Sequence, residues 1–224
     1  MSTRIEPGPT FELAPYRSLE DELLAERIES VRKRLGSELL ILGHHYQQDA
    51  VIEHSDLRGD SYQLSKMAAD NSDCRWIVFC GVHFMAETAD IVANRPEKVA
   101  ERDGRRVEVV LPDLAAGCSM ADMAAIEQVE AAWEDLAEVV DTDEITPITY
   151  INSAASLKSF CGRHGGAVCS SSNAAGILEW AFERRRQVLF FPDQHLGRNT
   201  ALAMGISNDR MPVWDPHADE LGGN

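Results

Sequence analysis

The chain has 224 residues, the length of one large domain or two small ones at roughly 100–200 residues per domain. Its hydrophobic fraction of 44% and charged fraction of 26% are typical of a globular protein and exclude a disordered or fibrous one. The 21 Lys and Arg residues are outnumbered by 37 Asp and Glu residues, and the net charge of −16 argues against nucleic acid as a partner, because phosphate binding needs a basic surface.

The predicted elements alternate between helices and strands. Residues 1–20 form an N-terminal arm, and an amphipathic helix over Leu19–Leu35 ends at Gly36. Short apolar runs then predict six strands, over Glu38–Leu42, Trp76–Cys80, Val107–Leu111, Pro147–Ile151, Gly166–Cys169 and Val188–Phe191. Further helices are predicted over Ser61–Asn71, Met85–Ala93, Met120–Ala137, Ser153–Gly162, Asn173–Arg185 and Thr200–Met204. This alternation predicts an α/β fold with parallel sheets, in which ligands bind beyond the carboxyl ends of the strands.

The polar segments that follow the strands recur in the same order in both halves, which predicts an internal duplication. In the clearest pairing LPDL resembles FPDQ, so that Asp113 is equated with Asp193, and Cys80 with Cys169. We therefore expect two repeated three-layer α/β domains, at residues 21–125 and 126–212, and the start of a linker at 213–224. A single six-stranded sheet remains an alternative.

A histidine-rich turn, GHHYQ, follows the first predicted strand. His44 offers an imidazole that can accept or donate a proton near pH 7, and Tyr46 a phenol that can hydrogen-bond a developing oxyanion. A capped turn whose histidines only satisfy backbone groups is an equally good interpretation. Ser61 begins the next helix, where it or Asp60 can act as a cap, and where free N–H groups also attract anions.

Polar residues also follow two predicted strands of the second half. Residues 170–173, SSSN, precede a helix, and three hydroxyls with an amide exceed what a cap needs, which favours an anion site over simple capping. Tyr150 and Asn152 point to the same side of a strand and can present a phenol and an amide to one ligand. A core tyrosine followed by a turn-forming asparagine explains them equally well.

The five cysteines, odd in number, do not indicate a disulfide framework. Cys118 lies in a small-residue loop, AAGCSMAD, directly before a predicted helix, where a thiolate is stabilised and a bulky ligand can approach. The sequence contains no CxxC pair, so a metal cluster would need cysteines from distant segments. It also lacks an apolar run of the roughly 18 residues that span a membrane, and a signal peptide, so we expect a cytoplasmic protein without a membrane partner.

A family resemblance emerges when these segments are taken together. The chain resembles quinolinate synthase, the iron–sulfur enzyme family of de novo NAD biosynthesis, in the ordered segments GHHYQ, GDSYQLSKMAA, FCGVHFMAETA, LPDLAAGCSMADM, TYINSAASLKS, CSSSNA, FFPDQHLGRNTA and VWDPHADELGGN. The resemblance implies condensation of iminoaspartate, supplied by an aspartate oxidase, with dihydroxyacetone phosphate to give quinolinate. It also implies three similar α/β domains around a pseudo-threefold axis, with a [4Fe–4S] cluster held by three cysteines at the centre.

The resemblance implies particular roles for eight residues. Cys118 is the cluster ligand, and His44 and Tyr46 are the candidates for proton transfer. The substrate-binding positions are His44, Ser61, Tyr150, Ile151, Asn152 and Ser171. The choice of Ser171 leaves its neighbours, residues 170 and 172, as alternatives.

Chains of the family continue past VWDP with two further ligand cysteines and a substrate-binding HPE segment, whereas this sequence ends at Asn224. We therefore expect the first two of three domains, with one of three cluster ligands. Two hypotheses follow from this comparison. The chain is a quinolinate synthase portion that is active only with the remainder, or it is a catalytically incomplete dicarboxylate- or phosphate-binding remnant of the fold.

Overall fold

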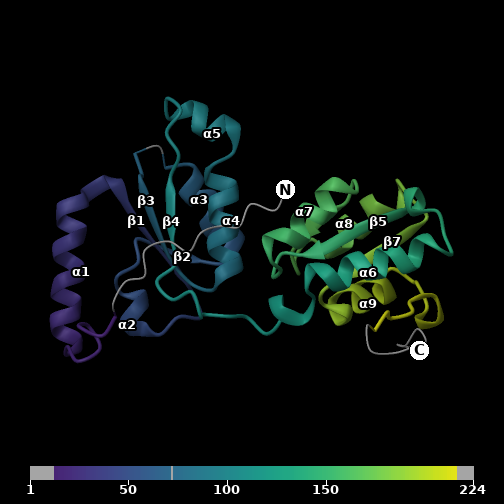
Figure 1. Ribbon diagram of the computed structural model, residues 1–224, viewed down its shortest axis with the longest axis horizontal. Coiled ribbons are helices and arrows are strands. Elements are labelled where there is room, and N and C mark those ends of the chain that lie inside the picture. The colour runs from purple at the N-terminus through teal and green to yellow at the C-terminus, as the bar shows by residue number, and fades with distance from the viewer. Residues whose placement is uncertain (1–12, 72, 216–224) are drawn as a thin grey trace.

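The computed structural model describes residues 13–71 and 73–215, which form two parallel β-sheets flanked by helices (Figure 1). We call the segment from α1 (Asp21–Leu35) to β4 (Glu108–Val110) the first unit, and the segment from α6 (Ile126–Ala137) to α9 (Gln194–Ala203) the second unit. The two units lie side by side, and α4 (His83–Ala93) of the first contacts α7 (Ala155–Arg163) of the second. Residues 1–12 of the expected arm and 216–224 of the expected linker lie outside the described residues.

The first unit contains a four-stranded sheet of order β2-β1-β3-β4, in which every neighbouring pair is parallel. Its strands are β1 Leu39–His44, β2 Leu57–Gly59, β3 Trp76–Cys80 and β4 Glu108–Val110. Its helices are α1 Asp21–Leu35, α2 Asp49–Ile52, α3 Ser61–Ala69, α4 His83–Ala93 and α5 Pro96–Glu101. Figure 1 shows α3 and α4 on one side of this sheet and α1 on the other.

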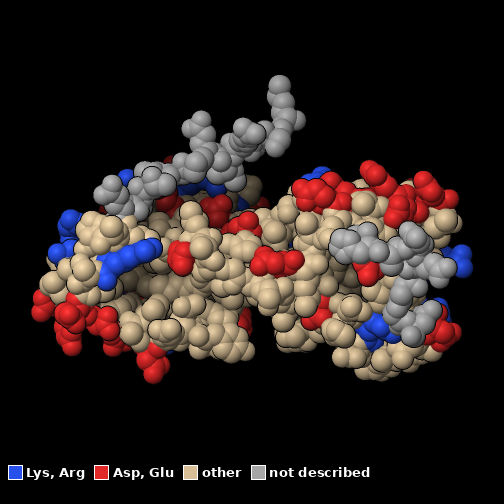
Figure 2. Space-filling view, turned by 60° about the horizontal axis from the view of Figure 1, so that its bottom comes forward, with Lys and Arg blue, Asp and Glu red and all other residues tan. Residues whose placement is uncertain are grey.

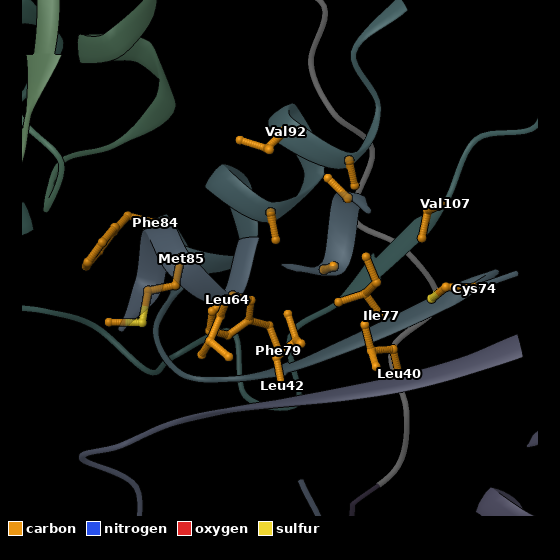
Figure 3. Packing of buried hydrophobic residues seen from close by; sticks show 14 of the residues in the cluster. Leu40, Leu42, Leu64, Cys74, Ile77, Phe79, Phe84, Met85, Val92 and Val107 are labelled. Carbon is orange, nitrogen blue, oxygen red and sulfur yellow. The ribbon is translucent and has the colours of Figure 1, made fainter. Parts of the chain in front are cut away.

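The core of the first unit lies between the central strands β1 and β3 and the helices α3 and α4 (Figure 3). Leu42, Leu64 and Phe79 are completely buried there. Complete burial of such a side chain contributes about 1.5–3 kcal/mol. Phe84, also completely buried, lies on the side of the core that faces the second unit. This packing fixes α4 to the sheet and therefore fixes the surface that α4 presents to α7.

The second unit contains a three-stranded parallel sheet of order β6-β5-β7. Its strands are β5 Ile145–Tyr150, β6 Ala167–Cys169 and β7 Gln187–Phe191. Its helices are α6 Ile126–Ala137, α7 Ala155–Arg163, α8 Ala174–Phe182 and α9 Gln194–Ala203. One core cluster joins α6 and α7 to Phe191, and a second joins α8 to Ile148. The helices thus cover both faces of the sheet.

The α/β class, the parallel pairing and all six predicted strands are confirmed, and the strands form two sheets rather than one. The prediction missed β2, α2 and α5, which are three, four and six residues long and too short to show a hydrophobic period. The helix predicted over Met120–Ala137 begins only at Ile126, because residues 121–123 form a separate 3-10 turn. The helix predicted over Thr200–Met204 begins earlier, at Gln194, because Asp193 caps it.

The strand order supports an internal duplication, but with a different pairing from the predicted one. In both sheets the earliest strand is central, so that β1, β2 and β3 correspond to β5, β6 and β7, and β4 is additional. The predicted equivalence of Asp113 with Asp193 is therefore wrong, because Asp113 follows β4 whereas Asp193 follows β7. The equivalence of Cys80 with Cys169 is wrong for the same reason, since these residues end β3 and β6.

Acidic side chains are more prominent than basic ones on the face that Figure 2 shows. They are spread over both units, and the basic side chains on this face are scattered rather than gathered into a stripe. Every helix within residues 13–71 and 73–215 is too short or too polar to cross a membrane.

Candidate functional site

The carboxyl ends of β1 and β2 bring together the polar residues of the first unit. His44, the last residue of β1, is aligned with Gly59, the last residue of β2. The next residue, Asp60, caps α3 by accepting a 2.8 Å hydrogen bond from the backbone N–H of Gln63. Ser61, which is buried, is the first residue of α3. His44 and Ser61 thus come from neighbouring strand ends, as the alternation of strands and helices predicts.

His44 is only 6% exposed, although it lies at the end of a strand. Its ring stacks on that of His45, with 4.5 Å between ring centroids and 24° between planes. Burial, and then the proximity of His45, lower the pKa of His44, while the Asp60 carboxylate opposes the change. The imidazole is therefore held in its neutral form near pH 7, in which one ring nitrogen can accept a proton.

Tyr46 is 83% exposed and lies directly beside the two histidines. Its ring centroid is 4.3 Å from that of His45 and 5.0 Å from that of His44. Its backbone N–H donates a hydrogen bond of 3.4 Å to His44 Nδ1, which orients the His44 ring. The phenol can thus contact a ligand at the strand ends while its backbone fixes the imidazole.

Tyr150 is the centre of the corresponding group in the second unit. It ends β5 and is aligned with Cys169, the last residue of β6. Burial raises the pKa of Tyr150, and the nearby carboxylate of Asp193 raises it further, whereas a hydrogen bond with the Ser171 side chain lowers it. The phenol is therefore a proton donor at neutral pH, and it lies next to the hydroxyl that follows the neighbouring strand.

The three serines after β6 differ in their hydrogen bonds. The hydroxyls of Ser170 and Ser172 lie 2.9 Å apart, and Ser170 is further bonded through its N–H and its hydroxyl to Asn173. Ser171, in contrast, is the serine of this segment whose side chain lowers the pKa of Tyr150. Asn173 precedes α8 but does not cap it with its side chain. These contacts support the choice of Ser171 as the serine directed toward Tyr150.

The rest of the 150–152 segment connects the second unit to the loop after β4. The backbone N–H of Ile151 donates to Cys169 O at 2.8 Å, and the Ile151 side chain is buried. The Asn152 amide lies 3.7 Å from the sulfur of Met120. The thiol of Cys118 is close enough to Tyr150 to influence its titration. The loop that carries Cys118 therefore approaches the Tyr150 group.

Within the described part of the chain, the thiols do not assemble a complete cluster site. Among the described residues, no three side chains of His, Cys, Asp or Glu gather as metal ligands. Burial raises the pKa of Cys80, Cys161 and Cys169, to about 12 for Cys161 and about 11 for Cys169. These thiols are therefore protonated at neutral pH, whereas a metal ligand must be a thiolate. Cys118 is the half-buried thiol of a loop and fits a single ligand, so a [4Fe–4S] cluster does not fit the described residues alone.

Sequence reasoning missed several neighbours of the site. The sequence pattern indicates Asp60 only as a cap, whereas in the structure it also raises the pKa of His44 against the effect of burial. Asp193 was singled out through an incorrect pairing, and its influence on Tyr150 depends on the order of the strands. No sequence pattern marks the contact of Met120 with Asn152. These contacts join segments that are far apart in the chain.

Comparison with known proteins identifies the relatives of this chain. A profile of the family described as Quinolinate synthetase A protein matches residues 26–219. The chain is 74% identical over 212 residues to a quinolinate synthase of Rhodopirellula baltica, covering 95% of this chain and 54% of the relative. It is 53% identical over 209 residues to one of Corynebacterium glutamicum, covering 93% and 50%. A third, from Bacillus anthracis, is 49% identical over 218 residues, covering 97% and 56%. The chain thus spans about half the length of the curated relatives it matches.

Proposed function

Because this chain belongs to the quinolinate synthetase A family, we propose that it supplies part of the active site of a quinolinate synthase. The proposed reaction condenses iminoaspartate with dihydroxyacetone phosphate to give quinolinate. The observation that carries the proposal is the alignment of the ends of β5 and β6, which brings Tyr150 beside the serines that follow Cys169, in the segments on which the family resemblance depends. A phenol, a hydroxyl and the N-terminal end of α8 together suit the anionic groups of both substrates.

Each candidate residue receives a role that follows from its surroundings. His44, buried and neutral, accepts a proton or a hydrogen bond from a bound substrate. Ser61, the first residue of α3, binds the substrate at the N-terminus of that helix. Tyr46, exposed beside His44, donates or moves a proton. Tyr150, Asn152 and the backbone of Ile151 orient the substrate from the second unit, and Ser171 binds its carboxylate or phosphate.

We further propose that Cys118 is one ligand of a [4Fe–4S] cluster whose other ligands are not among the described residues. When bound, such a cluster supplies an iron that acts as a Lewis acid. The approach of the Cys118 loop to Tyr150 supports this assignment. The shared strand order of the two units supports a repeated α/β domain, at 21–125 and 126–212, whereas the pseudo-threefold arrangement with a third unit rests on the family resemblance. The proposed cytoplasmic location rests on the sequence pattern, and the supply of iminoaspartate by an aspartate oxidase rests on the family resemblance alone.

The proposed function is tested in a chimera. The matched 212 residues of the Rhodopirellula baltica enzyme are replaced by the corresponding residues of this chain, and quinolinate formation is measured anaerobically. We expect a turnover within about tenfold of the parent enzyme, because one factor of ten corresponds to only about 1.4 kcal/mol. A chimera that folds and retains iron but forms no quinolinate would contradict the proposal.

Two serine variants of the chimera test the site itself. Ser171→Ala removes the proposed contact with an anionic group, which is worth about 1.5–3 kcal/mol, so kcat/KM falls by about ten- to a hundredfold. Ser172→Ala is the matched control, since this hydroxyl pairs with Ser170, and its kcat/KM stays close to that of the unmodified chimera. Equal effects of the two substitutions would remove Ser171 from the binding site.

A further inference from the structure

The helix α7 of the second unit receives its N-terminal hydrogen bond from the first unit. The backbone N–H of Ala155, the first residue of α7, donates to Glu87 Oε2 of α4 at 2.8 Å. The residue before it, Ala154, provides no side-chain cap. A carboxylate at the N-terminus of a helix satisfies a free N–H group and also interacts favourably with the helix dipole. Glu87 therefore performs across the two units the role that a capping residue normally has within one helix.

A lysine of α7 completes this contact. Lys158 Nζ donates to the backbone carbonyl of Ser153 at 2.6 Å and lies 5.4 Å from the centre of the Phe84 ring of α4. Burial lowers the pKa of Lys158 to about 8, and the carboxylate of Glu87 opposes this change. Phe84 and Glu87 are three residues apart on α4, as Ala155 and Lys158 are on α7, so each pair occupies one turn of its helix. We call these four residues the α4–α7 contact.

The α4–α7 contact holds the turn that carries two candidate site residues. Tyr150 ends β5, and residues 151–154, which include Asn152, connect it to α7. Inside this turn Ser153 is completely buried, and its hydroxyl donates to the Tyr150 carbonyl at 2.7 Å. Glu87 binds the end of the turn, and Lys158 binds its Ser153 carbonyl. On the other side, α4 begins three residues after the end of β3 and is packed on the sheet that carries His44.

We propose that Glu87 and Lys158 are positioning residues that hold the Tyr150 and Asn152 turn at a fixed place relative to the His44 group of the first unit. The effect on catalysis rests on the proposed function, whereas the effect on the turn does not. Neither residue belongs to the proposed set of substrate contacts. Removal of the Glu87 carboxylate leaves the Ala155 N–H without its partner, so the first turn of α7 is no longer held against α4. Tyr150 and Asn152 are then no longer fixed relative to His44, and a substrate that contacts both units is no longer held in one geometry.

The first arm of the test measures the turn itself in this chain. Amide hydrogen exchange of Ala155 is followed by NMR in Glu87→Ala, in Glu87→Gln and in Glu179→Ala, which alters an exposed residue of α8 as a matched control. Loss of one hydrogen bond corresponds to about tenfold faster exchange in Glu87→Ala, whereas Glu87→Gln keeps an acceptor oxygen and retains most of the protection. Unchanged exchange in Glu87→Ala would overturn the proposal, as would an equal change in Glu179→Ala.

The second arm measures activity in the chimera. We expect Glu87→Ala and Lys158→Met to lower kcat by about tenfold or more, with Glu87→Gln restoring most of it and the iron content unchanged. Equal losses in Glu87→Gln and Glu87→Ala would overturn a positioning role, because the amide can still accept from Ala155. An inactive unmodified chimera would contradict the proposed function instead, and the exchange arm would then decide the positioning of the turn by itself.

Discussion

Replacement of Gly166 by alanine tests how closely β5 and β6 approach each other. A Cβ at this position would lie 1.8 Å from the backbone oxygen of Pro147, where ordinary contact is 3.4–4 Å. A backbone oxygen cannot rotate away as a side chain can, so β6 must move from β5 and weaken a pairing that aligns Ile148 with Ala167. Overpacking costs about 1–3 kcal/mol, and each weakened hydrogen bond about 0.5–1.5 kcal/mol, so we expect a loss of roughly 2–4 kcal/mol.

The assay is urea unfolding of Gly166→Ala and of a matched variant, Gly162→Ala. Gly162 lies in α7, and a Cβ there meets nothing within 4 Å, so alanine should stabilise the helix by up to about 1 kcal/mol. At equal m-values the midpoint should fall in Gly166→Ala and stay equal or rise in Gly162→Ala. Equal midpoints in the two variants would refute the close approach of β6 to β5.

The remaining predictions concern a cap and two titrating groups. Asp60→Ala removes the cap of α3 and should lower the free energy of unfolding by about 0.5–2 kcal/mol, whereas Asp60→Asn should stay close to wild type. Equal losses of stability in the two variants would contradict the capping role. The pKa of His44 is lower in the folded state than its usual 6.5, so the unfolded state binds more protons and wild type should lose more stability than His44→Gln as the pH falls from 7 to 5. Parallel curves for these two proteins would contradict the burial of a neutral imidazole. The pKa of Lys158 is lowered from 10.5 to about 8, so wild type should gain stability relative to Lys158→Met as the pH rises from 8 to 10, by at most about 1.4 kcal/mol per pH unit. A constant difference in urea unfolding would show that Lys158 titrates as an exposed lysine.

Local sequence patterns predict the strands that lie at the centre of each sheet. The apolar runs at β1, β3 and β5 are buried central strands, and they were predicted because nearly every residue in them is apolar or β-branched. The β2 strand was missed, because its three residues include an exposed arginine and it is defined by pairing with β1. Strand order is likewise invisible to local pattern, and for that reason the predicted equivalence of Asp113 with Asp193 failed.

Some contacts of the candidate site follow from local sequence pattern, and others depend on how the two units pack. His44 and Ser61 follow neighbouring strands, and the rule that parallel strands gather their carboxyl ends was sufficient to place them together. The cap that Glu87 provides to α7 could not be predicted, because it depends on how two units pack. The sequence offers only a weak indication of this contact. Glu87 is a charged residue in the helix HFMAETADIVA, and Lys158 is one in the helix ASLKSFCGR.

The most direct test of the central claim, that both units contribute to one substrate site, is a crystal structure of the chimera with dihydroxyacetone phosphate. We predict an anionic group of the ligand within about 2.7–3.2 Å of the Ser171 hydroxyl or the Tyr150 phenol, with the rest of the ligand directed toward the strand ends that carry His44. A fully occupied ligand bound away from the carboxyl ends of both sheets would contradict the account.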